Sequence, residues 1–488
     1  MSTARLALVC SLLLGAASAA ASEVAHPTLE GPITGGAHGF PFIGTALDLT
    51  SHGYVEEEFF IEGSARAFAS DAPLTPDGRW SVTPAGRAPY RTRILVRRPR
   101  DAASFNGTVL VEWLNVSGGL DAGPDWAFLH GLLLRDGYAW VGVSAQAVGV
   151  DGFPADHPRA ALGNAGALKV WDPKRYASLV HPGDSYSYDL FAQVARALRK
   201  PEGADPLDGA EIQELIAIGE SQSAARLATY LNAVHSDARV YDAFLVHSRG
   251  GGSAPLSQAP EPERKAPDPV RIRDDLTVPV LTFATETDLI GLGFHRARQP
   301  DSDRFRLWEA AGTAHADAYQ LTVAMRDSNR VPQENSPIAS CALPINDGPQ
   351  HYLLKAAVHH LRRWARDGSP PPPAARLSVV AGDPGRILRD GFGNALGGIR
   401  SAPVDVPVST LSGEGNSGGV FCRLFGITEP FSPKALTMLY GSPSAYQEAF
   451  DQAVEDSVRA GFLLAADAQP MRDEARRVAI DAPDAAAP

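Results

Sequence analysis

Short apolar runs alternate with helix-like patterns through the middle of this chain. Residues 108–114, 138–143 and 215–218 are apolar enough to be buried strands, and residues 126–135 carry apolar side chains at helical spacing. Further strand-like runs follow at residues 243–246, 280–284 and 305–310. Because strands that alternate with helices form parallel sheets covered on both faces, the pattern predicts an α/β fold with a mostly parallel central sheet.

The pattern changes towards both ends of the chain. Residues 54–67 and 93–96 are rich in aromatic and β-branched side chains and predict strands that precede the alternation. Beyond residue 330, Gly- and Pro-rich stretches separate helical patterns at residues 352–364, 435–439 and 445–460. We therefore expect an α/β core at residues 22–330 and a helical and irregular C-terminal extension of the same domain, packed on it, at residues 331–488.

The first residues have the composition of a secretory signal peptide. Arg5 supplies a positive charge, residues 6–14 form an apolar core too short to span a bilayer, and residues 17–19 or 19–21 form a small-residue cleavage site. The pattern predicts that residues 1–21 are removed on export to the periplasm or the medium, with a short anchor helix as the alternative. We expect no membrane insertion after cleavage.

Composition and charge narrow the function further. The hydrophobic content of 44% is that of a globular protein with a sizeable core, and the formal net charge is −12. An acidic chain without a basic block is not expected to bind nucleic acid. The sequence carries none of the usual zinc or nucleotide patterns, so we expect no metal and no cofactor. The oligomeric state stays open.

Two cysteines remain once Cys10 leaves with the signal peptide. Cys341 and Cys422 form an even pair in a chain expected to reach an oxidising compartment. We therefore predict a disulfide between them, with two free buried thiols as the alternative.

The clearest candidate for chemistry lies where an apolar run meets a helical pattern. The run at residues 215–218 leads into Gly219-Glu-Ser-Gln-Ser223, and the helical pattern begins at Ala224. A strand, a sharp turn and a helix form the layout that exposes a serine hydroxyl near a helix N-terminus. The turn needs small residues two positions before and after the serine, which Gly219 and Ser223 provide. The pattern predicts Ser221 as a nucleophile.

Two other serines stand in similar patterns. Ser185 lies in Gly-Asp-Ser-Tyr-Ser, but Pro182 precedes it closely, and proline is disfavoured in a central strand. Ser417 lies in Gly-Asn-Ser-Gly-Gly, with no apolar run before it and no histidine after it. The context favours Ser221 over both.

A serine nucleophile needs a base, and the base needs an acid that orients it. In chains with this turn the order is serine, acid, histidine. The strand at residues 280–284 runs into Glu286-Thr-Asp288, and its phasing favours Asp288, with Glu286 as the second choice. The strand at residues 305–310 leads into a Gly-containing loop with His315, which we predict to be the base.

Two further sets of residues complete the predicted site. The oxyanion hole is expected to use the N–H of Gln222 and an N–H from the loop after the strand at residues 108–114, with Asn115 favoured. Four aromatic residues lie near the site loops and could line a substrate pocket, although core packing is the favoured interpretation for each. These aromatic candidates are Trp113, Trp126, Tyr186 and Phe294.

With these residues in place, the chain resembles the α/β-hydrolase superfamily, and more narrowly the bacterial "alpha/beta hydrolase domain-containing" proteins. One departure is Ser223, where the superfamily usually has a second glycine. The resemblance spreads over most of the mature chain and includes the C-terminal extension. It is carried by Val111-Glu-Trp-Leu-Asn-Val-Ser-Gly-Gly119, Gly219-Glu-Ser-Gln-Ser223, Glu286-Thr-Asp288, Gly312-Thr-Ala-His315 and Cys422-Arg-Leu-Phe-Gly426.

The resemblance implies a serine hydrolase that cleaves carboxylic esters, small or polymeric, through an acyl-enzyme intermediate, and the signal-peptide pattern predicts that it is exported. An acyltransferase or a peptidase with the same three residues is the first alternative. A non-catalytic binding protein on a hydrolase scaffold is the second.

Overall fold

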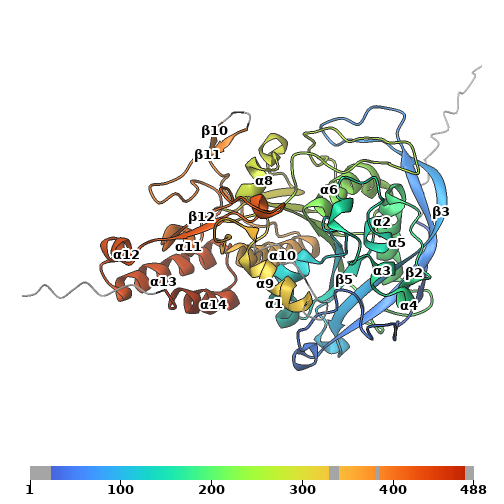
Figure 1. The fold of residues 1–488 in the computed structure, drawn as a ribbon, viewed down its shortest axis with the longest axis horizontal. Helices are drawn as coiled ribbons and strands as arrows, with labels where there is room; N and C mark the ends of the chain where they lie inside the picture. Colours follow the sequence, from blue (N-terminus) through green and yellow to red (C-terminus); the bar gives the residue numbers. More distant parts are fainter. Residues whose placement is uncertain (1–23, 329–339, 381, 383, 479–488) are drawn as a thin grey trace, which may run out of the picture.

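The apolar runs of the sequence come together in a nine-stranded sheet with the order β1-β2-β3-β5-β4-β6-β7-β8-β9 (Figure 1). The computed structural model describes residues 24–328, 340–380, 382 and 384–478. From β5 to β9 every neighbouring pair is parallel, whereas β1, β2, β3 and β5 pair antiparallel. The parallel strands are β4 (Thr108–Trp113), β5 (Ala139–Val143), β6 (Glu214–Glu220), β7 (Ala243–His247), β8 (Val280–Ala284) and β9 (Phe305–Glu309).

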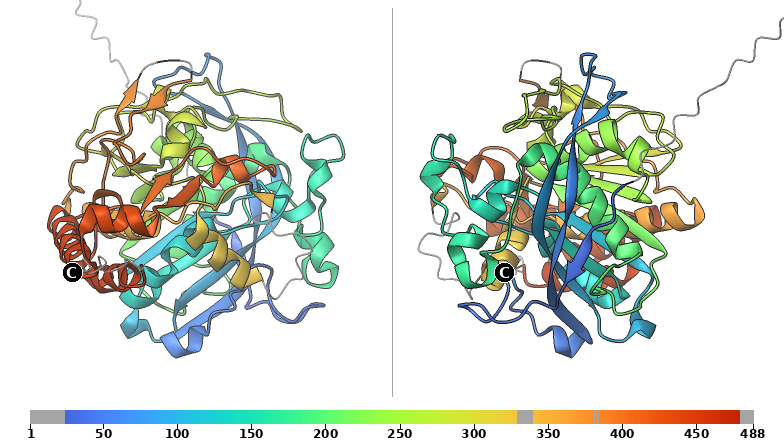
Figure 2. Two further views of the ribbon diagram at one scale, coloured as in Figure 1. Left: turned by 60° about the vertical axis from the view of Figure 1, so that its left-hand side comes forward. Right: turned by 90° about the vertical axis from the view of Figure 1, so that its right-hand side faces the viewer.

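The antiparallel part is dominated by a long hairpin. Strands β2 (Tyr54–Ala69) and β3 (Thr83–Pro99) pair along most of their length, and the short β1 (Thr28–Glu30) adds to the outer edge. Figure 2 shows this hairpin running along the height of the molecule. The sequence pattern found both long strands but underestimated β3.

Helices cover both faces of the sheet, as the alternating pattern predicts. Helices α1 (Pro124–Asp136) and α10 (Gln350–Asp367) pack their apolar side chains on one face, and α5 (Ser187–Arg199) and α6 (Gln222–Thr229) pack on the other. Side chains that alternate along β4 and β6 divide between these two cores, so each parallel strand is buried on both sides. The remaining helices of the core are α2 (Ala147–Asp151), α3 (Leu168–Trp171), α4 (Pro173–Tyr176), α7 (His235–Ala238), α8 (Glu286–Ile290) and α9 (Ala318–Ser328).

Helix α10 lies within residues 331–488 but belongs to the core, because it covers the sheet beside α1. The described part of the C-terminal extension after α10 packs on this core at the end opposite the β2–β3 hairpin (Figure 1). At Ile399 it adds one parallel bridge to Ala310 beyond the sheet edge, where Ile399 donates to Glu309 O at 2.7 Å and accepts from Ala311 N at 3.0 Å. The fold class that the sequence predicts is thereby confirmed. The elements of the extension are β10 (Val379–Val380), β11 (Arg386–Ile387), α11 (Ala402–Asp405), β12 (Ser409–Ser412), β13 (Ile427–Pro430), α12 (Pro433–Tyr440), α13 (Pro443–Ala460) and α14 (Ala465–Ala475).

Parts of the extension differ from the sequence pattern. Strands β12 and β13 form a two-stranded antiparallel sheet that was not predicted, because both are short and carry polar residues. Helix α14 was also missed, since Pro470 lies inside it and proline usually ends a helical pattern. The predicted signal peptide at residues 1–21 lies outside the described residues. No helix in the described part of the chain is long and apolar enough to cross a bilayer.

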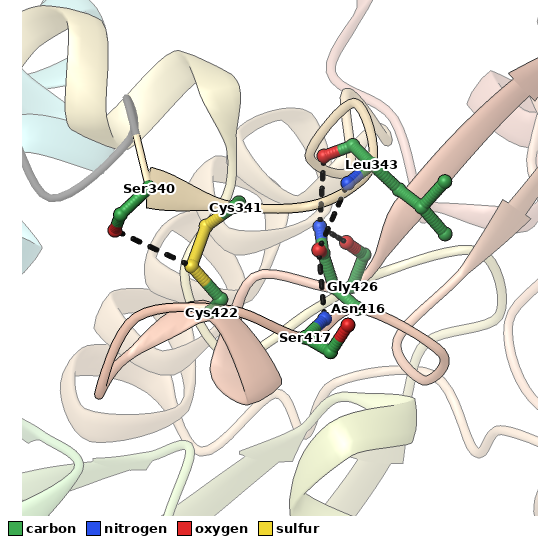
Figure 3. The surroundings of a disulfide bond; sticks show 7 residues. All are labelled: Ser340, Cys341, Leu343, Asn416, Ser417, Cys422 and Gly426. Atoms are coloured by element: carbon green, nitrogen blue, oxygen red, sulfur yellow. Dashed lines mark hydrogen bonds between the residues drawn. A yellow bond between two sulfur atoms is a disulfide. The ribbon is translucent and has the colours of Figure 1, made fainter.

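A disulfide joins Cys341 to Cys422, 81 positions apart in sequence, with their Cα atoms 5.4 Å apart (Figure 3). Asn416 ties the same two segments together, since its Nδ2 donates to Leu343 O at 3.1 Å and to Gly426 O at 2.7 Å. The disulfide and the amide therefore hold the segment before α10 against the loop between β12 and β13.

Candidate active site

The turn after β6 has the strained geometry that exposes a serine. Strand β6 ends at Glu220, α6 begins at Gln222, and Ser221 between them has φ 62° and ψ −116°. A non-glycine residue in this region costs about 1–3 kcal/mol and persists where the surrounding structure enforces it. A Cβ atom at Gly219 would lie only 3.1 Å from Ser223 Cβ, which explains why both positions are small.

Three side chains that the sequence singled out meet at this turn. Ser221 Oγ lies 2.8 Å from His315 Nε2, and Asp288 Oδ1 lies 2.6 Å from His315 Nδ1. Asp288 and His315 are buried, whereas Ser221 is partly exposed. Ser221 directly follows β6, Asp288 lies in α8 after β8, and His315 lies in the loop after β9, so all three are at the carboxyl ends where such sheets gather their functional groups.

The second candidate acid, Glu286, has other partners. Its Oε1 accepts from Gly312 N at 2.6 Å, and its Oε2 accepts from Gly413 N at 3.1 Å and Arg389 Nη2 at 2.9 Å. These contacts hold the loop of His315 and a segment of the extension, and they do not include the imidazole. The geometry thus places Asp288 at the histidine and gives Glu286 a supporting position.

The loops of Asp288 and His315 rest on the C-terminal extension. Thr287 Oγ1 donates to Gly413 O at 2.6 Å and accepts from His315 N at 3.1 Å. Next to the histidine, Ala316 N donates to Leu424 O at 3.2 Å. The extension therefore fixes the backbone that carries the imidazole.

A fourth side chain, which the sequence reasoning did not consider, completes this cluster. Glu220 Oε1 lies 3.1 Å from His315 Nε2, the same nitrogen that faces Ser221. Burial raises the pKa of Glu220 to about 7, although His315 opposes the rise. Burial disfavours the charged form of His315, but Glu220 and Asp288 outweigh it and raise the pKa of His315 to about 9. The available signal was a carboxylate next to the serine, at the end of a strand whose interior is apolar.

The two predicted oxyanion donors, Gln222 and Asn115, differ in whether their backbone N–H groups already have hydrogen-bond partners. Gln222 is the first residue of α6, and its N–H has no partner within the described chain, as is usual in the first turn of a helix. The prediction for Asn115 needs correction, because its N–H donates to Ala122 O at 2.9 Å in a local bridge. Its Nδ2 donates to Glu220 O at 3.2 Å and to Glu220 Oε2 at 3.3 Å. The next residue, Val116, has an N–H without a partner in the part of the chain that the structure describes.

The four aromatic residues suggested for a pocket belong to the hydrophobic cores. Trp113 donates to Gln146 Oε1 at 3.0 Å, and Phe294 is covered by the guanidinium of Arg249. Burial by neighbouring elements, which one sequence does not show, decides their place. All four, Trp113, Trp126, Tyr186 and Phe294, are at most 5% exposed and lie in the two cores that flank the sheet.

The two look-alike serines have structural partners. Ser185 Oγ donates to Gln258 O at 2.6 Å and accepts from Gln258 N at 2.8 Å, so it pins a loop. Ser417 lies beside the disulfide, and its N–H donates to Asn416 Oδ1 at 2.9 Å (Figure 3). Neither forms a hydrogen bond to a histidine among the described residues.

A second histidine–carboxylate pair lies behind the turn. His247 Nδ1 is 2.7 Å from Asp125 Oδ1, both side chains are fully buried, and His247 O accepts from Ser221 N at 2.9 Å. Burial raises the pKa of Asp125 to about 8 and lowers the pKa of His247 to about 4, so the imidazole is neutral. This pair supports the backbone of the turn.

Two negative findings delimit the site. In the described ranges no group of three or more His, Cys, Asp or Glu side chains could hold a metal ion. A cavity of about 900 Å³ lies between α9 and α10 and the C-terminal helices, lined among others by Tyr319, His351 and Tyr446, but not by Ser221 or His315.

Comparison with known families agrees with this geometry. Residues 29–473 match the model of a family described as "Alpha/beta hydrolase domain". The chain belongs to this family. The match includes nearly all of the C-terminal extension, so the extension is part of this α/β hydrolase. No curated protein matches the sequence.

Solved structures with a distantly similar fold include several esterases. A fungal esterase from Rhizomucor miehei has 12% identity, covers 63% of this chain and 84% of its own, and gives a TM-score of 0.28. A glucuronoyl esterase from Solibacter usitatus has 10% identity, coverages of 63% and 86%, and a TM-score of 0.28. Acetyl xylan esterase 1 from Thermoanaerobacterium sp. JW/SL YS485 has 8% identity, coverages of 50% and 80%, and a TM-score of 0.26. Likenesses this distant do not identify a substrate.

Proposed function

We propose that this α/β hydrolase is an exported serine esterase that cleaves carboxylic esters through an acyl-enzyme intermediate. The observation that carries the proposal is the continuous contact from Asp288 through His315 to the hydroxyl of Ser221, at a turn strained to expose it. Ester bonds are proposed because the motifs resemble those of carboxylic ester hydrolases. Export is proposed from the signal-like pattern of residues 1–21, and the disulfide suits an oxidising compartment.

The contacts support a two-step reaction. Ser221 Oγ attacks the ester carbonyl carbon while His315 Nε2 takes the hydroxyl proton, and Asp288 stabilises the imidazolium through Nδ1. The tetrahedral intermediate then collapses, the ester C–O bond breaks, and Nε2 gives its proton to the leaving alcohol oxygen. In the second step water loses a proton to Nε2 and attacks the acyl carbon. The bond from the acyl carbon to Ser221 Oγ then breaks, Nε2 returns its proton to Oγ, and the acid is released.

The developing oxyanion needs two N–H donors. Gln222 N at the start of α6 supplies one, aided by the positive end of the helix dipole. For the second donor the proposal replaces Asn115 by Val116, since the N–H of Asn115 is occupied. Asn115 instead holds the carboxylate of Glu220.

The test combines ester turnover with covalent labelling. The wild-type protein is expected to hydrolyse p-nitrophenyl acyl esters and to react with a fluorophosphonate probe, with the label on the peptide that contains Ser221. Ser221→Ala should lose both properties, whereas Ser185→Ala and Ser417→Ala serve as matched controls that keep them. Full turnover by Ser221→Ala would refute the proposal, and absence of label from the folded wild type would favour a non-catalytic binding protein.

The same acyl-enzyme could pass its acyl group to an alcohol or be formed from a peptide. Adding a primary alcohol to the ester assay separates these outcomes, because a hydrolase gives mainly free acid and a transferase gives mainly the new ester. A peptide substrate should remain uncleaved.

A further inference from the structure

Glu220 contacts the nitrogen that would carry the transferred proton. Its Oε1 lies 3.1 Å from His315 Nε2, while Ser221 Oγ lies 2.8 Å from the same atom. The imidazole is therefore held by a carboxylate on each side, Asp288 at Nδ1 and Glu220 at Nε2. A catalytic triad of serine, histidine and acid requires only the carboxylate at Nδ1, which Asp288 supplies.

The position of Glu220 is fixed from three directions. Its backbone belongs to the last residue of β6, so it cannot move without disturbing the turn at Ser221. Asn115 Nδ2 reaches both its carbonyl oxygen and Oε2. Its side chain is 6% exposed, and no Arg or Lys among the described residues forms an ion pair with it. Within the described ranges, the imidazole of His315 is the one basic group that forms an ion pair with this carboxylate.

The titratable groups around this contact come from three elements. Asp288 on α8 acts on both Glu220 and His315, Asp125 on α1 acts on Glu220, and His247 on β7 interacts with both. His247 is neutral, and Asp125 is paired with it. Glu220 and Asp288 are therefore the two charges that face the imidazole.

We propose that Glu220 is a positioning residue for the base, which stabilises the imidazolium of His315 at Nε2 after the serine proton has been taken and before that proton is passed to the leaving group. The inference rests on the proposed function. The proton stays on Nε2 throughout this interval, Glu220 remains ionised, and no bond to Glu220 forms or breaks.

The consequence is a distinctive pH dependence. Below the pKa of His315 the imidazole is protonated in the resting enzyme as well as in the transition state. Glu220 then stabilises both states, so it does not change kcat/KM. Above that pKa the resting imidazole is neutral, so Glu220 stabilises only the transition state and raises kcat/KM. Because His315 has a pKa raised to about 9, kcat/KM of the wild type should rise up to about pH 9. Below about pH 7 Glu220 is itself protonated and has no charge to contribute.

The experiment compares pH profiles of kcat/KM for the wild type, Glu220→Gln and Glu220→Asp. Glu220→Gln should shift the rising limb down by at least one pH unit and lower the rate above pH 9.5 by about tenfold or more, with rates close to wild type below pH 7. Glu220→Asp, which keeps the charge but shortens the side chain, should lie between the two. Glu214→Gln, a buried carboxylate at the other end of β6, is the matched control and should leave the limb in place.

The outcomes separate this inference from the proposed function. If the wild type hydrolyses esters but the rising limb of its kcat/KM profile has an apparent pKa of 6.5 or lower, the inference is wrong. This result does not depend on whether the variants fold. If Glu220→Gln lowers the rate equally at all pH values, Glu220 has only a structural role and the inference is again wrong. If the wild type neither turns over esters nor takes up the fluorophosphonate label, the proposed function itself has failed.

Discussion

The serine side of the site and its acid–histidine side are built in different ways. The serine side lies within one stretch of chain, where β6, the turn at Ser221 and α6 follow one another directly. The acid–histidine side depends on the C-terminal extension, since Glu286 and Thr287 bond Gly413 and Ala316 bonds Leu424. The backbone strain lies at Ser221 on the serine side, whereas the supporting contacts from distant segments lie on the acid–histidine side.

This difference predicts that substitutions on the two sides affect activity and folding in different ways. A change at the serine side removes chemistry and leaves the fold intact. A change in the extension should act on activity at a distance, because it moves the backbone that carries His315. The variants below test that division, beginning with the largest expected effect.

Exchanging the two neighbouring carboxylates for amides should separate chemistry from support. Asp288→Asn removes the charge at His315 Nδ1 and should lower kcat by about 10³–10⁴-fold without loss of folding. Glu286→Gln removes the ion pair with Arg389 and weakens the bonds to Gly312 and Gly413, so it should lower the free energy of unfolding by about 1–3 kcal/mol. Its kcat at 25 °C should stay within about tenfold of wild type. Assays and urea unfolding on both variants check this, and an equal loss of kcat in a folded Glu286→Gln protein would reverse the assignment.

The same division explains what the sequence could predict. Ser221 was found because strand, turn and helix are adjacent in the chain, and His315 and Asp288 because each follows an apolar strand. The core positions of Trp113 and Phe294 agree with the interpretation that the sequence favours. The contacts of Asn115 with Glu220 were not predictable, since they depend on which distant segments pack together. A single sequence carries no direct signal for such packing.

The extension shows the same limit at the level of the fold. Its helices α12 and α13 follow clear apolar patterns and were predicted. Strands β12 and β13 are short, and they are strands only because each pairs with the other across the disulfide-tied loop. The sequence therefore did not predict that this loop supports the backbone of His315.

Removal of the disulfide should loosen the acid–histidine side selectively. Replacing both Cys341 and Cys422 by serine should lower the free energy of unfolding by about 2–4 kcal/mol. Hydrogen exchange should speed up around residues 312–317 and 412–428, because Leu424 O bonds Ala316 N. Helix α6 should keep its protection. Equal loss of protection in α6 would show that the two sides are not independent.

Gly413→Ala tests the support of His315 through a backbone contact. A Cβ at Gly413 would lie 2.6 Å from Glu286 Cβ, Thr287 N and Thr313 O, so the acid and histidine loops must shift. Misplacement by about 1 Å costs up to about a hundredfold, and we expect kcat/KM to fall by about 10–100-fold. Gly391→Ala is the matched control in the same extension, since nothing lies within 4 Å of its Cβ. If both variants keep full activity, the extension does not position the histidine.

The smallest expected effect concerns the strain at Ser221 itself. Ser221→Gly and Ser221→Ala both remove the nucleophile, but only glycine relieves the backbone at φ 62°. The relief of about 1–3 kcal/mol exceeds the cost of about 0.4–1 kcal/mol from the freer unfolded chain, so the glycine variant should be more stable than the alanine variant by about 1 kcal/mol. Urea unfolding of the pair measures the difference. Equal stability, or a less stable glycine variant, would mean that the turn stores no strain, and the serine side would then owe its geometry to packing in the same way as the histidine side.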